Sequence, residues 1–248
     1  MIAKGNENII KGSENQLLGH KNLIDGNLNT VQGNENSISG NLNKMKGDKN
    51  IAVGDKNNIY GNENTSLGSE NSIEGNKNLL NGNKNTVRGE ENSIKGNENE
   101  ITGNRNTIKK DKNKVAGNEN MIDGEMNQLI GNFNQLFGSK NLVKGDSNRV
   151  KGDENLLAGN LNAVEGSKNQ IGGNENLVAG NENTVLGDQN AILKGNRNQV
   201  KGSQNTIKNG DNNQVEGSLN LVDGHSNKLK TNESTVKGNQ NELVGNRL

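Results

Sequence analysis

A seven-residue repeat runs through almost the whole chain and constrains its fold more than any other feature. The unit reads Gly-Asn-x-Asn-x-(Ile/Val/Leu)-x, as in residues 33–39 and 82–88, and about 34 full units follow one another. Position one is Gly in every full unit except those of Lys110 and Thr231, and position six is apolar everywhere except at Ser66. Such strict periodicity is the signature of a repeat architecture rather than of a globular domain.

The spacing of the apolar residues favours short strands over helices. One apolar residue in seven gives no a/d seam for a coiled coil, and one Gly per heptad costs about 1 kcal/mol each in a helix. In a strand, positions four and six share one face, while positions five and seven share the other. Position six is then the core residue, Gly at position one supplies a positive φ, and the position-four Asn points inward at the corner.

Charges at position three indicate how many heptads make one coil. In both alternate sets of units the sign changes every 14 residues, as in Glu7, Lys21, Glu35 and Lys49, and in Lys140, Glu154, Lys168 and Glu182. Opposite charges attract when they lie above one another about 4.8 Å apart. Two units carry an extra residue, Lys194 and Asn209, which then fall one coil apart on the same corner, so that one bulge matches the next.

These observations predict an all-β fold: a parallel β-solenoid with two heptads, or 14 residues, per coil. Two narrow sheets face each other, about 17–18 coils follow one another, and residues 1–248 form a single repeat domain. The unit with Thr231 and Ser234 lacks both the Gly and the Asn, so we expect the weakest coil there.

Composition and motifs argue against several classes of function. The 29 basic and 29 acidic residues balance, which gives no basic excess for nucleic acid, and there is no Cys for disulfides or thiolate metal sites. The N-terminus has no apolar segment typical of a signal peptide, and no stretch approaches the ~18 consecutive apolar residues of a membrane-spanning helix. His20 and His225 are too far apart in the repeat to share a site. Asp-x-Asn runs lack the ligand density of a calcium loop, so we expect neither an enzyme nor a cofactor.

The sequence Asn-x-Val-x-Gly, as in residues 85–89 and 183–187, resembles the repeat of the ryegrass-type ice-binding proteins. The resemblance covers nearly the whole chain and implies a left-handed β-roll with ice as a partner. A looser similarity exists to the head repeats of trimeric autotransporter adhesins, which implies a module that binds a surface. The motif is specific for the fold and less specific for function, because function depends on the outward positions.

Ice binding, as the resemblance implies it, requires one flat face of regularly spaced and mostly small residues, often Thr. The position-five threonines are scattered, and no two of them fall in one column in consecutive coils. They are Thr30, Thr65, Thr86, Thr107, Thr184, Thr206 and Thr235. Long or bulky neighbours such as Lys44, Leu79 and Glu100 interrupt the array, so ice binding is here the alternative hypothesis.

The leading hypothesis from the residues alone is a structural rod that assembles with itself. No capping unit is visible, and solenoids normally need caps to cover the exposed strand edges. Residues 1–4 resemble positions four to seven, and residues 245–248 supply positions one to four. Head-to-tail stacking would nearly complete a heptad and would produce a filament or a shaft.

Outward apolar residues gather in two groups that could contact a partner, or could be ordinary scattered surface residues. The first group is Met121, Met126, Ile130, Phe133 and Phe137. The second group is Ile51, Val53, Leu67 and Leu79. Ala52 and Ser66 place small residues at core positions beside the second group, so a local shift that brings Val53 and Leu67 inward is an open alternative.

Overall fold

A computed structural model describes residues 2–245 of the chain. Over these residues, 35 strands of two or three residues alternate between two parallel sheets, named sheet A and sheet B. Each heptad contributes one strand, so two heptads make one coil and the chain forms about 17 coils. The predicted all-β solenoid and its 14-residue coil are confirmed. The described residues include no helix that is long and apolar enough to cross a membrane.

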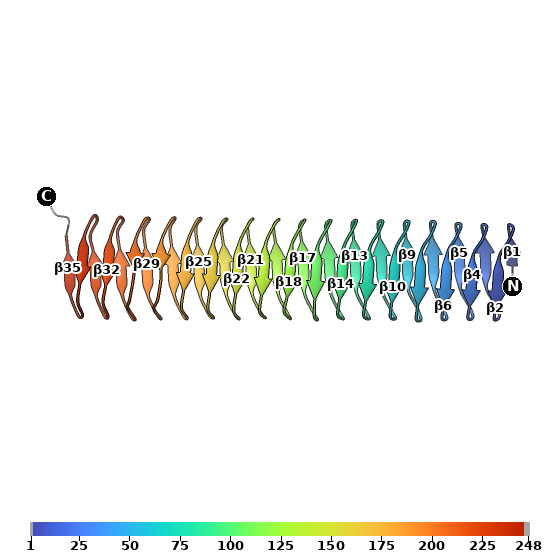
Figure 1. Cartoon of the computed structure of the whole chain (residues 1–248), viewed down its shortest axis with the longest axis horizontal. Helices are drawn as coiled ribbons and strands as arrows, with labels where there is room; N and C mark the ends of the chain where they lie inside the picture. The colour runs from blue at the N-terminus through green and yellow to red at the C-terminus, as the bar shows by residue number, and fades with distance from the viewer. Residues whose placement is uncertain (1, 246–248) are drawn as a thin grey trace. The chain divides into compact units, whose positions relative to one another are not determined.

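The chain divides into two compact units, residues 1–126 and residues 127–248, which are called the first and the second unit below. Figure 1 shows that the coils of each unit follow one another in sequence order, so that every second strand lies side by side in one sheet. The single-domain organisation over residues 1–248 and the left-handed winding stay predictions.

In the first unit, sheet A consists of β1 (Ile2–Lys4), β3 (Gln16–Leu18), β5 (Thr30–Gln32), β7 (Lys44–Lys46), β9 (Asn58–Tyr60), β11 (Ser72–Glu74), β13 (Thr86–Arg88), β15 (Glu100–Thr102) and β17 (Lys114–Ala116). Sheet B consists of β2 (Ile9–Lys11), β4 (Leu23–Asp25), β6 (Ser37–Ser39), β8 (Ile51–Val53), β10 (Thr65–Leu67), β12 (Leu79–Asn81), β14 (Ser93–Lys95), β16 (Thr107–Lys109) and β18 (Met121–Asp123).

In the second unit, sheet A consists of β19 (Gln128–Ile130), β21 (Leu142–Lys144), β23 (Leu156–Ala158), β25 (Gln170–Gly172), β27 (Thr184–Leu186), β29 (Gln199–Lys201), β31 (Gln214–Glu216), β33 (Lys228–Lys230) and β35 (Glu242–Val244). Sheet B consists of β20 (Gln135–Phe137), β22 (Arg149–Lys151), β24 (Ala163–Glu165), β26 (Leu177–Ala179), β28 (Ala191–Ile192), β30 (Thr206–Ile207), β32 (Leu221–Asp223) and β34 (Thr235–Lys237).

The core is one row of position-six side chains from each sheet. From β3 to β34 these residues, such as Ile94 and Leu157, are buried, and paired strands hold them in register, as Ile94 with Ile108. Ala52 and Ser66 keep the inward position, while Val53 and Leu67 point outward. The proposed local shift is therefore wrong.

The hydrogen bonds of Ser66 explain why the chain keeps its register there. The Ser66 hydroxyl donates to Asn57 Oδ1 and accepts from Asn71 Nδ2, both at 3.1 Å. Because the buried hydroxyl has both a donor and an acceptor, its burial costs little. The small side chain at position six therefore needs no change of strand register.

Most turns contain two residues with positive φ, and the turns that begin at Gly210 and Thr231 contain one, at position three. Gly at position one was predicted to supply one of them, and at Gly82 an added Cβ would overlap the carbonyl oxygen of Gly96 in the next coil. The second is position three, where φ lies near +58° in every described turn even though the residue is usually Glu or Lys. A backbone bond between coils holds this conformation, as when Lys84 N donates to Ser69 O at 3.0 Å.

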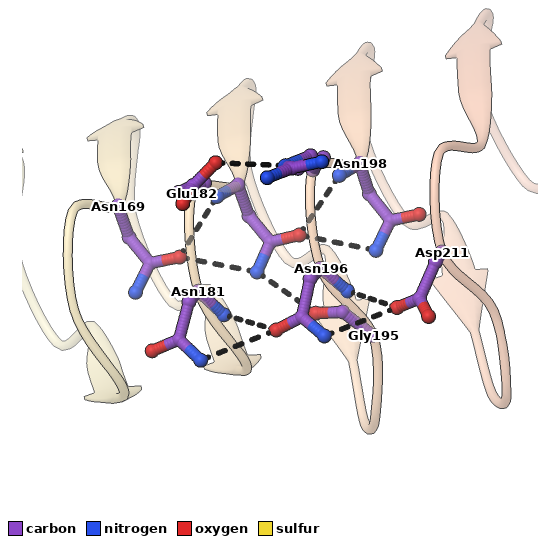
Figure 2. Close-up of polar contacts among 9 residues, drawn as sticks. Asn169, Asn181, Glu182, Gly195, Asn196, Asn198 and Asp211 are labelled. Atoms are coloured by element: carbon purple, nitrogen blue, oxygen red, sulfur yellow. Dashed lines mark hydrogen bonds and ion pairs between the residues drawn. The ribbon is translucent and has the colours of Figure 1, made fainter.

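Two rows of polar side chains run along a corner in opposite directions, as Figure 2 shows for the corner around Gly195. In the inner row, at position four, Asn198 N and Nδ2 both donate at 3.0 Å to Oδ1 of Asn183 in the preceding coil. In the outer row, at position two, Asn181 N donates at 2.8 Å to Oδ1 of Asn196 in the following coil. Asn196 N donates in turn to Asp211 Oδ1 at 2.6 Å.

The direction of the rows explains which residues each position accepts. An inner Asn must also donate from Nδ2 to a turn carbonyl, as Asn183 does to Gly195 O at 3.1 Å, so it needs both an amide donor and an acceptor. The outer position needs only an acceptor that faces the preceding coil. Asp, Ser and the Nδ1 atom of His therefore replace Asn there, as at Asp211 and at His225, which accepts from Asp211 N at 3.1 Å.

The charges at position three lie above one another, as predicted. Arg105 pairs with Glu119 at 3.3 Å and Lys140 with Glu154 at 3.5 Å. A hydrogen bond from Arg197, together with the positive charge of that residue, lowers the pKa of the Glu182 carboxyl. These pairs are exposed, so they fix the register more than they add stability.

The two extra residues form matched bulges on one corner. The strands before them, β28 and β30, are paired and shortened to two residues. Gly210 N donates to Lys194 O at 3.0 Å, so the hydrogen-bond ladder continues across both bulges. The predicted placement of Lys194 and Asn209 one coil apart is confirmed.

The unit with Thr231 and Ser234 lacks two side-chain bonds of the regular coil. Ser234 N still donates to Asn220 Oδ1 at 3.1 Å, but its hydroxyl bonds only within its own turn, to Thr231 and Asn232. In the regular coil, Asn227 Nδ2 reaches the carbonyl of Gly238 at 2.8 Å.

Restoring the repeat at this unit is expected to stabilise the protein. We predict that Thr231→Gly combined with Ser234→Asn raises the free energy of unfolding by about 2 kcal/mol, about 1 kcal/mol for each restored bond. Both changes are needed, because a Cβ at position one crowds the Asn amide of its own turn. Thermal melting and amide exchange of the double variant, with Thr231→Gly alone as the control, measure the effect. An unchanged melting temperature would contradict it.

Candidate functional site

The outward surface of sheet B in the first unit carries no charge over four consecutive coils. The strands are β6, β8, β10 and β12, and each presents its position-five and position-seven side chains to solvent. The eight residues, called the neutral face below, are Ser37, Ser39, Ile51, Val53, Thr65, Leu67, Leu79 and Asn81.

The strand register arranges these eight residues in two straight rows. Ile51, Thr65 and Leu79 are in-register neighbours in the position-five row, and Val53 and Leu67 are neighbours in the position-seven row. The four large apolar side chains are between 38% and 48% exposed. The structure therefore brings the second predicted group, Ile51, Val53, Leu67 and Leu79, together on one surface.

The opposite surface of the first unit, on sheet A, is charged. The outward side chains of β7 are Lys44 and Lys46, and Arg88 of β13 pairs with Glu74 of β11 at 3.5 Å. Lys114 of β17 pairs with Glu100 at 3.5 Å. The lack of charge is therefore a property of one surface and not of the repeat as such.

Charged residues border the neutral face in both directions along sheet B. On one side, β4 presents Asp25, and on the other side β14 and β16 present Lys95 and Lys109 at position seven. At about 4.8 Å per coil, the face spans roughly 15 Å along the stacking direction. Its backbone ladder is continuous, so the eight side chains stand on a rigid frame.

The structure confirms that the threonines do not stack on one another. Thr65 lies between Ile51 and Leu79, and Thr86 lies between Ser72 and Glu100. A face made of threonines alone is thus absent from the described strands. The neutral face mixes hydroxyl and aliphatic side chains instead.

The residues of the first predicted group are divided between the two units, and in the second unit between two sheets. Met121 points outward from β18, and Met126 lies exposed in the turn that follows. In the second unit, Ile130 is on sheet A and Phe137 is on sheet B, while Phe133 lies in the turn between their strands. Ile130 and Phe137 thus face opposite sides, and a contact role for these residues stays a prediction.

The titratable groups are turn or ladder residues, as predicted. His20 accepts through Nδ1 from Asn6 N at 3.0 Å, which makes it part of the outer row of its corner. Within residues 2–245, no three His, Asp or Glu side chains are grouped so that they could hold a metal ion.

Counting threonines in the sequence missed the neutral face. The signal that was available is the absence of charge when positions five and seven are read at 14-residue spacing. Between residues 37 and 81, the four heptads that contribute strands to sheet B are uncharged at both of these positions. A count of threonines considers single residues, whereas the neutral face depends on the absence of charged residues from several consecutive coils.

Comparison with known families gives one result that covers the chain. The family profile described as "Grass antifreeze beta roll" matches four overlapping segments, residues 1–61, 52–138, 110–193 and 179–248. A search of curated proteins finds no match to the chain. The family match agrees with the resemblance in the Asn-x-Val-x-Gly repeat and with the 14-residue coil.

Proposed function

Because the chain belongs to the grass antifreeze β-roll family, we propose that it binds ice, and that it does so through the neutral face of the first unit. The observation that carries the proposal is the run of eight uncharged outward residues on β6, β8, β10 and β12. No other outward surface of the described strands stays uncharged at both positions over four consecutive coils.

The chemistry of the face suits contact with a neutral, hydrogen-bonded lattice. Water beside the aliphatic groups of Ile51, Val53 and Leu79 stays bonded to other water, because these groups offer no partner. The hydroxyls of Ser37 and Thr65 can donate to and accept from lattice water. Lysine ammonium groups, by contrast, orient their own hydration shells strongly.

The rigidity of the strands beneath the neutral face also favours ice binding. Each outward side chain is held at a fixed spacing by backbone bonds between coils, such as Ile51 N to Asn64 O at 2.8 Å. The β-branched residues Ile51, Val53 and Thr65 have few accessible rotamers. Little side-chain entropy is therefore lost when the face becomes ordered against ice.

A single charge at the centre of the face tests the proposal. We expect Thr65→Lys to reduce ice adsorption roughly tenfold, which corresponds to about 1.4 kcal/mol of binding free energy. The reason is that the new ammonium group must lose hydration to approach the lattice. Thermal hysteresis and inhibition of ice recrystallisation measure the change.

The matched control is Thr86→Lys, the same substitution at position five of sheet A. Thr86 has Ser72 and Glu100 as neighbours, so the new lysine is tolerated there. It is expected to leave ice adsorption unchanged, and melting curves check that both variants fold. Equal loss in both variants would show that ice binding, if present, does not use the neutral face. A wild-type protein without any activity on ice would refute the function.

A further inference from the structure

The position-five row of sheet B continues without charge beyond the neutral face. Ser93 on β14 and Thr107 on β16 follow Leu79 in the same row. The change happens only at position seven, where Lys95 and Lys109 follow Asn81. Two lysines therefore mark the point at which the neutral face ends.

These two lysines are unusual within the ladder. They are in-register neighbours, and they are the one strand pair of like charge among the pairings that the structure describes. In the other described strand pairs that join two charged residues, the charges are opposite, as in Lys151 with Glu165 at 2.8 Å. Like charges directly beside each other on a sheet are destabilising, so stability does not account for this pair.

The surroundings of the pair neutralise it only in part. Lys109 pairs with Asp123 at 3.5 Å, and Asp123 is shared with Lys110 at 3.8 Å. Lys95 has no carboxylate within 4.0 Å among the described residues. Its ammonium group depends on water for its hydrogen bonds and keeps a strong hydration shell.

We infer that Lys95 and Lys109 are a charged boundary that confines ice adsorption to the coils of β6, β8, β10 and β12. The inference rests on the proposed function and adds the residues that set the extent of the site. Their hydration shells stand beside Ser93 and Thr107 and disturb the water that those residues would otherwise share with the lattice. Without the two lysines, the uncharged surface would extend from four coils to six.

The test is a gain of activity rather than a loss. Lys95→Thr combined with Lys109→Thr is expected to raise ice adsorption roughly tenfold, because the binding free energy grows with the contact area and the uncharged surface covers six coils instead of four. Thr suits an outward strand position, and Asp123 keeps Lys110 as its partner. Thermal hysteresis at equal protein concentration gives the readout.

The control removes two lysines from the opposite surface of the same unit. Lys46→Thr on β7 combined with Lys114→Thr on β17 changes the net charge equally. We expect no gain from it, because Lys44 on β7 and Glu100 beside β17 keep that surface charged. Equal gains in both double variants would assign the effect to net charge and overturn the inference. An active wild type whose activity does not rise in Lys95→Thr/Lys109→Thr would also overturn it, while the proposed function would stand. If the wild type and both double variants are all inactive on ice, the proposed function fails and the inference fails with it.

Discussion

Ile94→Asp is expected to lower the free energy of unfolding by about 4 kcal/mol or more, and to open the coils around β14 first. Ile94 is 1% exposed and lies between Leu80 and Ile108 in the core row of sheet B. The core has one apolar side chain per heptad, so no second layer can shield a carboxylate. Circular dichroism during melting gives the global effect, and amide exchange locates the opened coils.

Ser93→Asp is the matched control, because Ser93 is the adjacent residue of the same strand and points outward. Its in-register neighbours Leu79 and Thr107 are uncharged, so we expect a change within about 0.5 kcal/mol. Comparable destabilisation by the two substitutions would contradict the assignment of position six to the core. Unchanged melting in Ile94→Asp would contradict it as well.

The coil length was predictable because charge signs report on contacts between heptads. Lys140 and Glu154 are 14 residues apart in sequence, and their side chains meet at 3.5 Å in the structure. The seven-residue period alone predicts where each strand lies in the repeat, but it does not predict how many strands form one coil. The alternation of sign supplied that number, and the paired bulges at Lys194 and Asn209 supplied it independently.

The conformation of position three was not predictable from residue types. Residues such as Glu98 and Lys84 have no special preference for positive φ, so nothing in the sequence marks them. The cause is a contact with the preceding coil, where Glu98 N donates to Asn83 O at 2.9 Å. A local propensity is overridden here by a bond that exists only after the coils have stacked.

The surface was predictable in part. Ile51, Val53, Leu67 and Leu79 were identified as one outward group, and the register confirms that they share a face. The uncharged surroundings of this group were missed, because the sequence was searched for threonines and not for missing charge. Self-assembly into a filament and an adhesin-like role stay predictions, and sedimentation velocity at rising concentration would test the first.

The inner Asn row leads to the second large prediction. We expect Asn85→Asp to lower the free energy of unfolding by about 3–5 kcal/mol, although the two side chains have nearly the same shape. Asn85 Nδ2 donates to Gly96 O at 2.8 Å and to Asn71 Oδ1 at 3.1 Å. A carboxylate oxygen in that place would face two acceptors, and the residue is fully buried. Urea unfolding at neutral pH measures the loss.

The outer row provides the control, because Asn83→Asp makes the same chemical change two residues away. Asn83 Oδ1 accepts from Ser69 N at 2.7 Å, which a carboxylate does equally well, and only the exposed bond from Asn83 Nδ2 to Asn97 at 3.2 Å is lost. The chain already uses Asp in this role at Asp55, which accepts from Asn41 N at 2.7 Å. We therefore expect a change of about 0.5 kcal/mol or less. Unfolding of both variants at the same urea concentration would contradict the prediction. It would show that the direction of the hydrogen bonds in each row does not determine whether Asp can replace Asn.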